Sequence, residues 1–228
     1  MANQARMNDA AIALSRLLAA AAIKFGIFGG FAISTHGGPR ESKDIDCLAA
    51  SYKAELLRLL DGKGGFTAVP QSRDDYVAFM WSDKPDRSRG VLVEIFPERF
   101  QDAQYGMQNV TTNAALVAST RKTSEPVQFL DLFSIFKGKL KAAERRSKYH
   151  DSADLRWLAT NHSAHITPFV NRLNLLQVGL VIQRYPELES TFASLGIDVQ
   201  AAKEAAKPYD VKQSPPLARG DVQLGLLC

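Results

Sequence analysis

The chain has 228 residues, of which 46% are hydrophobic and 23% are charged, and its formal net charge is +4. This composition is that of a folded globular protein and argues against a largely disordered chain. The charge permits binding to nucleotides, nucleic acid or anionic surfaces without selecting among them. The only cysteines, Cys47 and Cys228, argue against a disulfide framework and are typical of a reducing compartment.

The N-terminal segment Ala10–Ile23 is apolar, but Ser15 and Arg16 interrupt it and Lys24 follows it. We interpret it as an amphipathic helix rather than as the core of a signal peptide. No segment reaches the roughly 20 apolar residues that a membrane-spanning helix needs. We therefore expect a cytoplasmic protein without a membrane partner.

The next elements alternate between strands and helices. A short buried strand is predicted at Phe25–Phe28, where Gly29-Gly30 ends it, and a helix begins at Phe31–Thr35. A loop leads into a second strand at Asp44–Ala49, and the leucine spacing of Tyr52–Leu60 predicts a helix. Three more strands are predicted, at Phe66–Val69, Tyr76–Trp81 and Gly90–Phe96.

From about residue 125 the pattern becomes helical. Helices are predicted at Phe129–Arg146, Asp151–Ala159 and Pro168–Arg184. The tail Val211–Cys228 lacks strong periodicity and is expected to be an arm or partly disordered. The chain is thus a mixed half followed by a helical half.

Two carboxylates separated by one apolar residue, Asp44-Ile45-Asp46, form the most informative motif. On a strand they point to the same face, with Cα atoms roughly 6.5 Å apart, so their oxygens can share metal ions. Glu94 is a single acid in an otherwise apolar strand, a costly position unless a cation or a donor compensates it. These three side chains are candidate metal ligands.

The diglycine Gly29-Gly30 lies where an apolar run ends, and thirteen residues separate it from Asp44. Without a Cβ, its backbone can approach an anion closely. The order Phe28-Gly29-Gly30, spacer, Asp44-Ile45-Asp46 resembles the signature of the DNA polymerase β-like nucleotidyltransferase superfamily. The stretch before Asp44 is most similar to the small antibiotic-type and abortive-infection-type members, which often carry an arginine and a serine or threonine at the places of Arg40 and Ser42.

The resemblance extends to the helical half. The segment around Lys139 is similar to the lysine-bearing helix of these proteins. The residues that follow are similar to their basic-acidic turn, with Arg146 and Lys148 as the basic residues and Asp151 and Asp154 as the acidic ones. It implies an α/β (α+β) nucleotidyltransferase fold with a small mixed sheet flanked by helices, followed by a helical C-terminal domain. We accordingly expect a catalytic domain at 1–124, a helical domain at 125–210 and a tail at 211–228.

The resemblance also implies a reaction, the transfer of an NMP group from an NTP to an acceptor with release of pyrophosphate. Asp44, Asp46 and Glu94 would be the catalytic and metal-binding residues, with Mg²⁺ or Mn²⁺ as the cofactor. The diglycine and the following helix would hold the β- and γ-phosphates. The nucleotide-binding residues would be Gly29, Gly30, Arg40, Ser42 and Lys139. The acceptor, whether a small molecule, a protein or a tRNA, stays open, as do the base and the oligomeric state.

Other interpretations of the same residues remain. Glu94 could pair with Arg89 or Arg99 instead of a metal, and Lys139 could be a solvated flank of its helix. The basic residues near Lys139 could contact RNA, so a non-catalytic nucleotide- or RNA-binding module on the same fold is the alternative function. A different transfer chemistry on the same fold is a third possible function.

Overall fold

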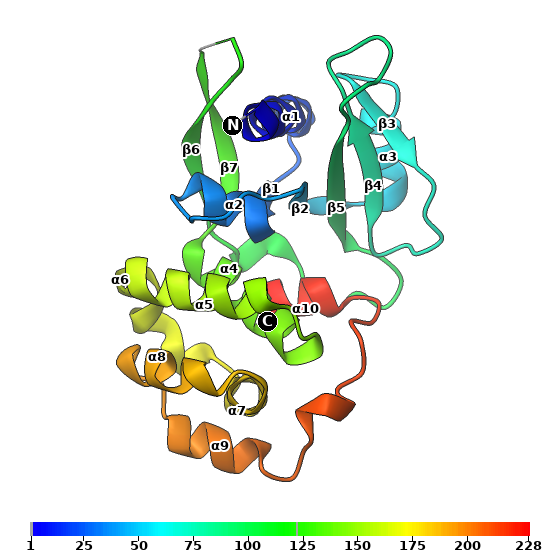
Figure 1. The fold of residues 1–228 in the computed structure, drawn as a ribbon. Coiled ribbons are helices and arrows are strands. Elements are labelled where there is room, and N and C mark those ends of the chain that lie inside the picture. Colours follow the sequence, from blue (N-terminus) through cyan, green and yellow to red (C-terminus); the bar gives the residue numbers. More distant parts are fainter. Residues whose placement is uncertain (1, 122) are drawn as a thin grey trace. The chain divides into compact units, whose positions relative to one another are not determined.

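The computed structural model describes residues 2–121 and 123–228 (Figure 1). It consists of two compact units, the first running to Asp131 and the second beginning at Leu132, with Leu227 grouped with the first. The division thus falls after Asp131 rather than after residue 124, where we expected it. Residues 211–226 group with the helical unit instead of forming a separate tail.

The first unit is built on one seven-stranded sheet with the order β3-β4-β5-β2-β1-β7-β6. Strands β2 and β5 run parallel, as do β1 and β7, and the remaining neighbours are antiparallel. The strands are β1 (Phe25–Phe28), β2 (Asp44–Tyr52), β3 (Phe66–Val69), β4 (Val77–Trp81), β5 (Val91–Arg99), β6 (Thr112–Ala118) and β7 (Ser124–Leu130). This mixed sheet with its helices confirms the predicted α/β (α+β) fold class.

Three helices accompany the sheet, α1 (Ala2–Ala20), α2 (Gly29–Thr35) and α3 (Lys53–Leu60), together with the short 3₁₀ helix η1 (Met107–Asn109). Figure 1 shows α1 end-on between the β6–β7 hairpin and β5, and it contacts both of them. Its buried side chains include Leu14 and Leu18, as expected for an amphipathic helix. None of the helices in the described part of the chain combines the length and the apolar character that crossing a membrane requires.

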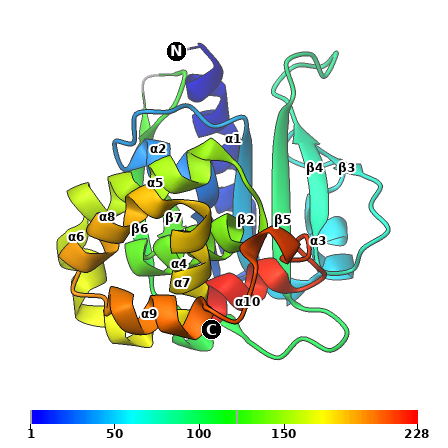
Figure 2. The same ribbon diagram turned by 60° about the horizontal axis from the view of Figure 1, so that its bottom comes forward.

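The second unit is helical (Figure 2). Its core contains Phe136 and Phe192, whose ring centroids lie 6.3 Å apart, and α7 packs on α9. Its α-helices are α4 (Leu132–Arg145), α5 (Tyr149–Asn161), α6 (Ser163–Ile166), α7 (Leu175–Arg184), α8 (Glu189–Ser194), α9 (Val199–Ala206) and α10 (Asp221–Leu227). Short 3₁₀ helices are η2 (Thr167–Arg172), η3 (Pro186–Leu188) and η4 (Val211–Gln213).

Three sequence predictions of elements were wrong in part. Residues 129 and 130 belong to β7 rather than to the helix predicted from Phe129, because Phe129 pairs with β1 in the sheet. The helix predicted at Pro168–Arg184 is interrupted, and Asn174 caps a new helix by accepting a hydrogen bond from the Gln177 amide. The tail, expected to be irregular, contains helix α10.

Candidate active site

Two parallel strands bring the three acids to one face of the sheet. In the register of β2 and β5, Asp46 lies beside Glu94 and Asp44 beside Leu92. Asp44, Asp46 and Glu94 are half-buried, whereas the intervening Ile45 and the equivalent Val93 are fully buried on the other face. Because side chains alternate along a strand, the three carboxylates share the more accessible face.

The first glycine of the diglycine lies directly against the second aspartate. Gly29 has a φ of +72°, and a Cβ built on it would stand 2.1 Å from Oδ2 of Asp46. Both its backbone conformation and the nearby carboxylate exclude a larger residue. The end of β1 and the start of β2 therefore meet with no side chain between the Gly29 backbone and Asp46.

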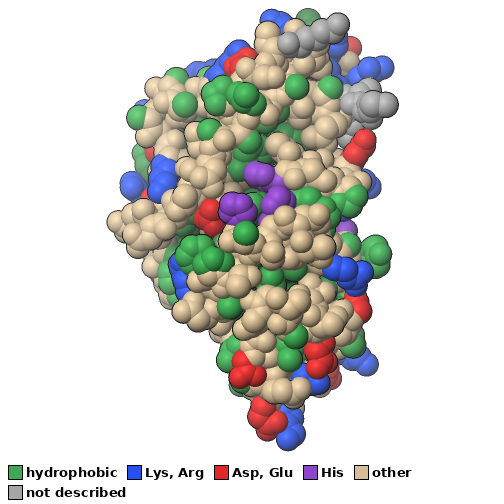
Figure 3. Space-filling model, turned by 90° about the vertical axis from the view of Figure 1, so that its left-hand side faces the viewer, with side chains coloured by type: hydrophobic (Ala, Val, Ile, Leu, Met, Phe, Trp, Pro, Cys, Tyr) green, Lys and Arg blue, Asp and Glu red, His purple; other side chains and the backbone are tan. Residues whose placement is uncertain are grey.

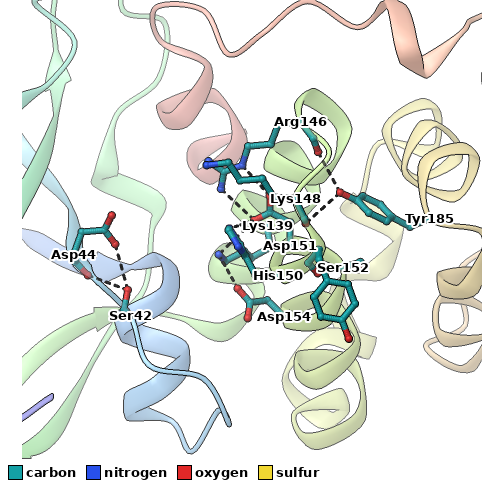
Figure 4. A network of polar contacts seen from close by, with 11 residues as sticks. Ser42, Asp44, Lys139, Arg146, Lys148, His150, Asp151, Ser152, Asp154 and Tyr185 are labelled. Atoms are coloured by element: carbon teal, nitrogen blue, oxygen red, sulfur yellow. Dashed lines mark hydrogen bonds and ion pairs between the residues drawn. The ribbon is translucent and has the colours of Figure 1, made fainter. Parts of the chain in front are cut away.

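The second glycine lies against two polar residues of the loop that joins α2 to β2. A Cβ on Gly30 would be 2.7 Å from Oγ of Ser42 and 3.0 Å from Nη2 of Arg40. The Ser42 hydroxyl is buried and lies 3.2 Å from Oδ1 of Asp44 (Figure 4). Ser42 thus positions Asp44, while the Arg40 guanidinium supplies positive charge beside the diglycine.

The electrostatics of Glu94 reflect its surroundings. Partial burial, and secondarily the negative charge of Asp44, raise the pKa of the Glu94 carboxyl above its usual range. No hydrogen bond or ion pair of Glu94 is found among residues 2–121 and 123–228, so the expected alternative, a pair with Arg89 or Arg99, does not form in this structure. Arg99 instead contacts Glu98.

This shift predicts a pH-dependent effect of Glu94→Gln in metal-free protein. A raised pKa means that the folded state favours the protonated carboxyl, so its contribution to stability is lost as pH rises through that pKa. We expect the variant, which resembles protonated Glu94, to be more stable than wild type at neutral pH. The difference should disappear below pH 4.5, the ordinary pKa of the group. Urea unfolding in the presence of chelator across pH 4–8 measures the difference in the free energy of unfolding between the variant and wild type. Glu204→Gln is the control, because Glu204 is exposed.

The acids suit a hard divalent cation by their chemistry, since all three offer carboxylate oxygens on neighbouring strands. Across residues 2–121 and 123–228, no three acidic, histidine or cysteine side chains form a preassembled metal cluster. The fit of Mg²⁺ to this site thus depends on the chemistry of its donors, which are carboxylate oxygens.

Lys139 lies in the second unit, within a network of buried charges (Figure 4). Its Nζ is 2.8 Å from Oδ2 of Asp154 and 3.7 Å from Oδ1 of Asp151. Asp151 is fully buried and also accepts two hydrogen bonds from Arg146, at 2.8 and 3.1 Å. Lys139 is thus not a solvated flank of its helix. Its implied role in triphosphate binding stays a prediction.

The basic residues around Lys139 do not form a solvated basic surface. Lys137 is buried, with its ammonium 5.6 Å from the centre of the Phe133 ring. Glu144 pairs with Lys141 at 3.1 Å and with Arg145 at 3.2 Å. On the face drawn in Figure 3, basic and acidic side chains are interspersed rather than gathered by sign. Lys148 of the same run is exposed, and contact of this run with RNA stays a prediction.

Comparisons with known proteins address the fold. No protein-family model matches the chain, and no curated protein matches it. Among solved structures, the crystal structure of an antigenic nucleotidyltransferase-like protein from Paracoccidioides brasiliensis superimposes with a TM-score of 0.54, at 18% identity, over 82% of this chain and 92% of that one. The chain therefore has a nucleotidyltransferase-like fold.

Proposed function

We propose that this protein transfers a nucleoside monophosphate from an NTP to an acceptor, with Mg²⁺ or Mn²⁺ as the cofactor. The observation that carries this proposal is the meeting of Gly29-Gly30 with Asp46, Ser42 and Arg40 beside a third acid, Glu94. A glycine backbone, a cation and a hydroxyl next to three carboxylates supply what a nucleotide triphosphate and its metal require.

In the proposed reaction, a bond forms between an acceptor oxygen and the α-phosphorus while the bond to the β-phosphate oxygen breaks. Pyrophosphate leaves, and the acceptor hydroxyl loses its proton. The diglycine lets the phosphates approach, and Arg40 offsets their negative charge. Ser42 holds the Asp44 carboxylate in place by the contact at 3.2 Å. Glu94 orients the acceptor oxygen from the neighbouring strand.

Asp44, Asp46 and Glu94 would hold the metal ion, which supplies charge neutralisation at the phosphates. Catalysis in this chemistry comes mainly from positioning and from stabilising developing charge. A site half open to solvent on a rigid sheet suits that task, because strands hold their side chains more firmly than loops do.

Calorimetric titration tests whether the protein binds the NTP donor together with the metal ion. Wild-type protein is titrated with ATP, GTP, CTP and UTP in the presence of magnesium and then of chelator. The double variant Asp44→Asn, Asp46→Asn is expected to bind the preferred nucleotide at least 10-fold more weakly with magnesium, because its metal ligands have lost their charge. Wild type in chelator should resemble it.

The matched control is Asp198→Asn, Asp210→Asn. It removes the same two charges, and both positions are helix caps that asparagine fills equally well. Equal magnesium-dependent binding by wild type and the Asp44, Asp46 variant would refute the proposal. Magnesium-dependent binding without transfer of α-labelled nucleotide to any component of a cell extract would favour the binding-module alternative.

A further inference from the structure

A row of neighbouring aromatic side chains, which Arg73 extends at one end, lies beside the acids of the sheet. The rings of Phe28 and Phe96 have centroids 5.7 Å apart, and Tyr76 stacks on Phe96 at 5.9 Å with an interplanar angle of 26°. The guanidinium of Arg73 lies over the Tyr76 ring, 5.3 Å from its centroid. Arg73 thus ends the row.

This row adjoins the acids. Ala78 of β4 pairs with Glu94 of β5, so Tyr76, two residues earlier, is the diagonal neighbour of Glu94. Diagonal neighbours across antiparallel strands have Cα atoms about 7–8 Å apart. Phe96, two residues after Glu94, lies on the same face. Tyr76 is therefore close enough to contact a substrate that also reaches Glu94, and Arg73 lies over the Tyr76 ring.

Arg73 is held in place before any ligand binds. Its Nε donates to Oδ1 of Asp75 at 2.8 Å, and its Nη2 donates to the other oxygen of the same carboxylate. Asp75 is fully buried, whereas 41% of the Arg73 side chain is exposed. The ammonium of Lys53 fixes the same loop through the carbonyl oxygens of Gln71 and Arg73. Because Asp75 offsets its charge, Arg73 offers chiefly a planar surface for stacking.

The order of strands places the diglycine at one side of the candidate site and Tyr76 at the other. The diglycine ends β1, the two aspartates begin β2, Glu94 is on β5, and Tyr76 directly precedes β4. These strands are consecutive neighbours in the sheet. In phosphoryl transfer the attacking and leaving oxygens lie roughly in line across the phosphorus. If the leaving pyrophosphate lies at the diglycine, the acceptor comes from the side of β5 and β4.

We propose that Arg73, stacked on Tyr76, is a platform for a base of the acceptor, and hence that the acceptor is a nucleotide, either free or at the end of an RNA strand. This inference rests on the proposed nucleotidyl transfer and names its acceptor class. A guanidinium plane extends an aromatic stack to a nucleobase, as in the recognition of single-stranded RNA. A serine or threonine side chain has no flat ring to place there.

Binding of a single-stranded RNA pentamer and of AMP tests the proposal. The donor site is first filled with magnesium and the α,β-methylene analogue of the preferred NTP. The key variant is Arg73→Lys, which keeps a cation beside Asp75 but removes the planar surface. We expect it to weaken pentamer binding about 10-fold, the size of one base stack, with unchanged affinity for the NTP analogue. Loss of AMP binding as well would indicate a free nucleotide acceptor, and loss for the pentamer alone an RNA end.

The matched control is Arg16→Lys, since Arg16 also forms a two-bond pair with a carboxylate, that of Glu125, and is exposed. It should leave pentamer binding unchanged. The inference is overturned if wild type binds neither probe, if Arg73→Lys binds them as wild type does, or if it weakens the NTP analogue instead. Failure of the proposed function is separate, because it appears as magnesium-independent NTP binding in wild type.

Discussion

Replacing Gly29 with alanine is expected to reduce nucleotidyl transfer about 100-fold or more. The new Cβ would stand 2.1 Å from Oδ2 of Asp46, so the carboxylate or the turn must shift by more than an ångström. A displacement of that size at a site that works by positioning can cost about 100-fold in rate. Incorporation of label from an α-labelled NTP, with magnesium-dependent NTP affinity measured alongside, gives the effect.

Gly62→Ala separates the contact from backbone strain. Gly62 has a φ of +73°, nearly the value at Gly29, but no atom lies within 4 Å of the Cβ it would gain. Both alanines carry the strain of left-handed backbone, about 1–2 kcal/mol, and both should lower the melting temperature. Only Gly29→Ala should lose transfer. Equal losses in the two variants would show that the approach of Gly29 to Asp46 has no part in the reaction.

Local sequence pattern was sufficient for the part of the candidate site formed by adjacent residues. The alternation of Asp44, Ile45 and Asp46 predicted a strand with both acids on one face, and β2 has that form because Ile45 and Cys47 are buried on the other. Glu94 was also expected on a strand, and β5 contains it. Periodicity carries this information because it depends only on neighbours along the chain.

Pairing between distant strands could not be predicted in this way. The resemblance to a known family grouped Glu94 with the two aspartates, but periodicity did not indicate that β2 would lie parallel to β5, the arrangement that places Glu94 beside Asp46. The location of Arg73 and Tyr76 near Glu94 was missed for the same reason, since it depends on the register of β4 with β5. A cue was present locally, because Arg73 and Asp75 lie just before Tyr76, the first residue of a predicted strand.

The β6–β7 hairpin was missed because its sequence is a poor match to strand composition. Strand β6 is largely exposed and alanine-rich, and β7 contains Pro126. Both features argue against a strand when read alone. In the structure Pro126 lies opposite Leu116 of the edge strand β6, while the pairing of β7 with β1 is at Phe129. The sheet thus accommodates Pro126 because it lies away from Phe129, the residue at which β7 pairs with β1.

Replacing Lys139 with methionine is expected to lower the free energy of unfolding by about 3–5 kcal/mol, the cost of removing one partner of a buried ion pair. The Lys139 ammonium lies 2.8 Å from Asp154, and both residues are at least nine-tenths buried, as is Asp151. Without the lysine, Asp154 would keep a charge out of water with its closest cation gone. Urea unfolding of the whole chain, followed by circular dichroism, measures the change.

Two further variants show whether burial is the cause. Lys203→Met breaks a pair of similar length, 3.0 Å to Glu189, but both of its side chains are substantially exposed, so a loss below about 1 kcal/mol is expected. The double variant Lys139→Met, Asp154→Asn removes the uncompensated charge and should recover a large part of the lost stability, while Arg146 still pairs with Asp151. If Lys139→Met were no more destabilising than Lys203→Met, the buried network would contribute little to stability. A role of the Lys139 ion pair in folding alone could then no longer explain why this lysine is buried, and the implied role in triphosphate binding would gain weight.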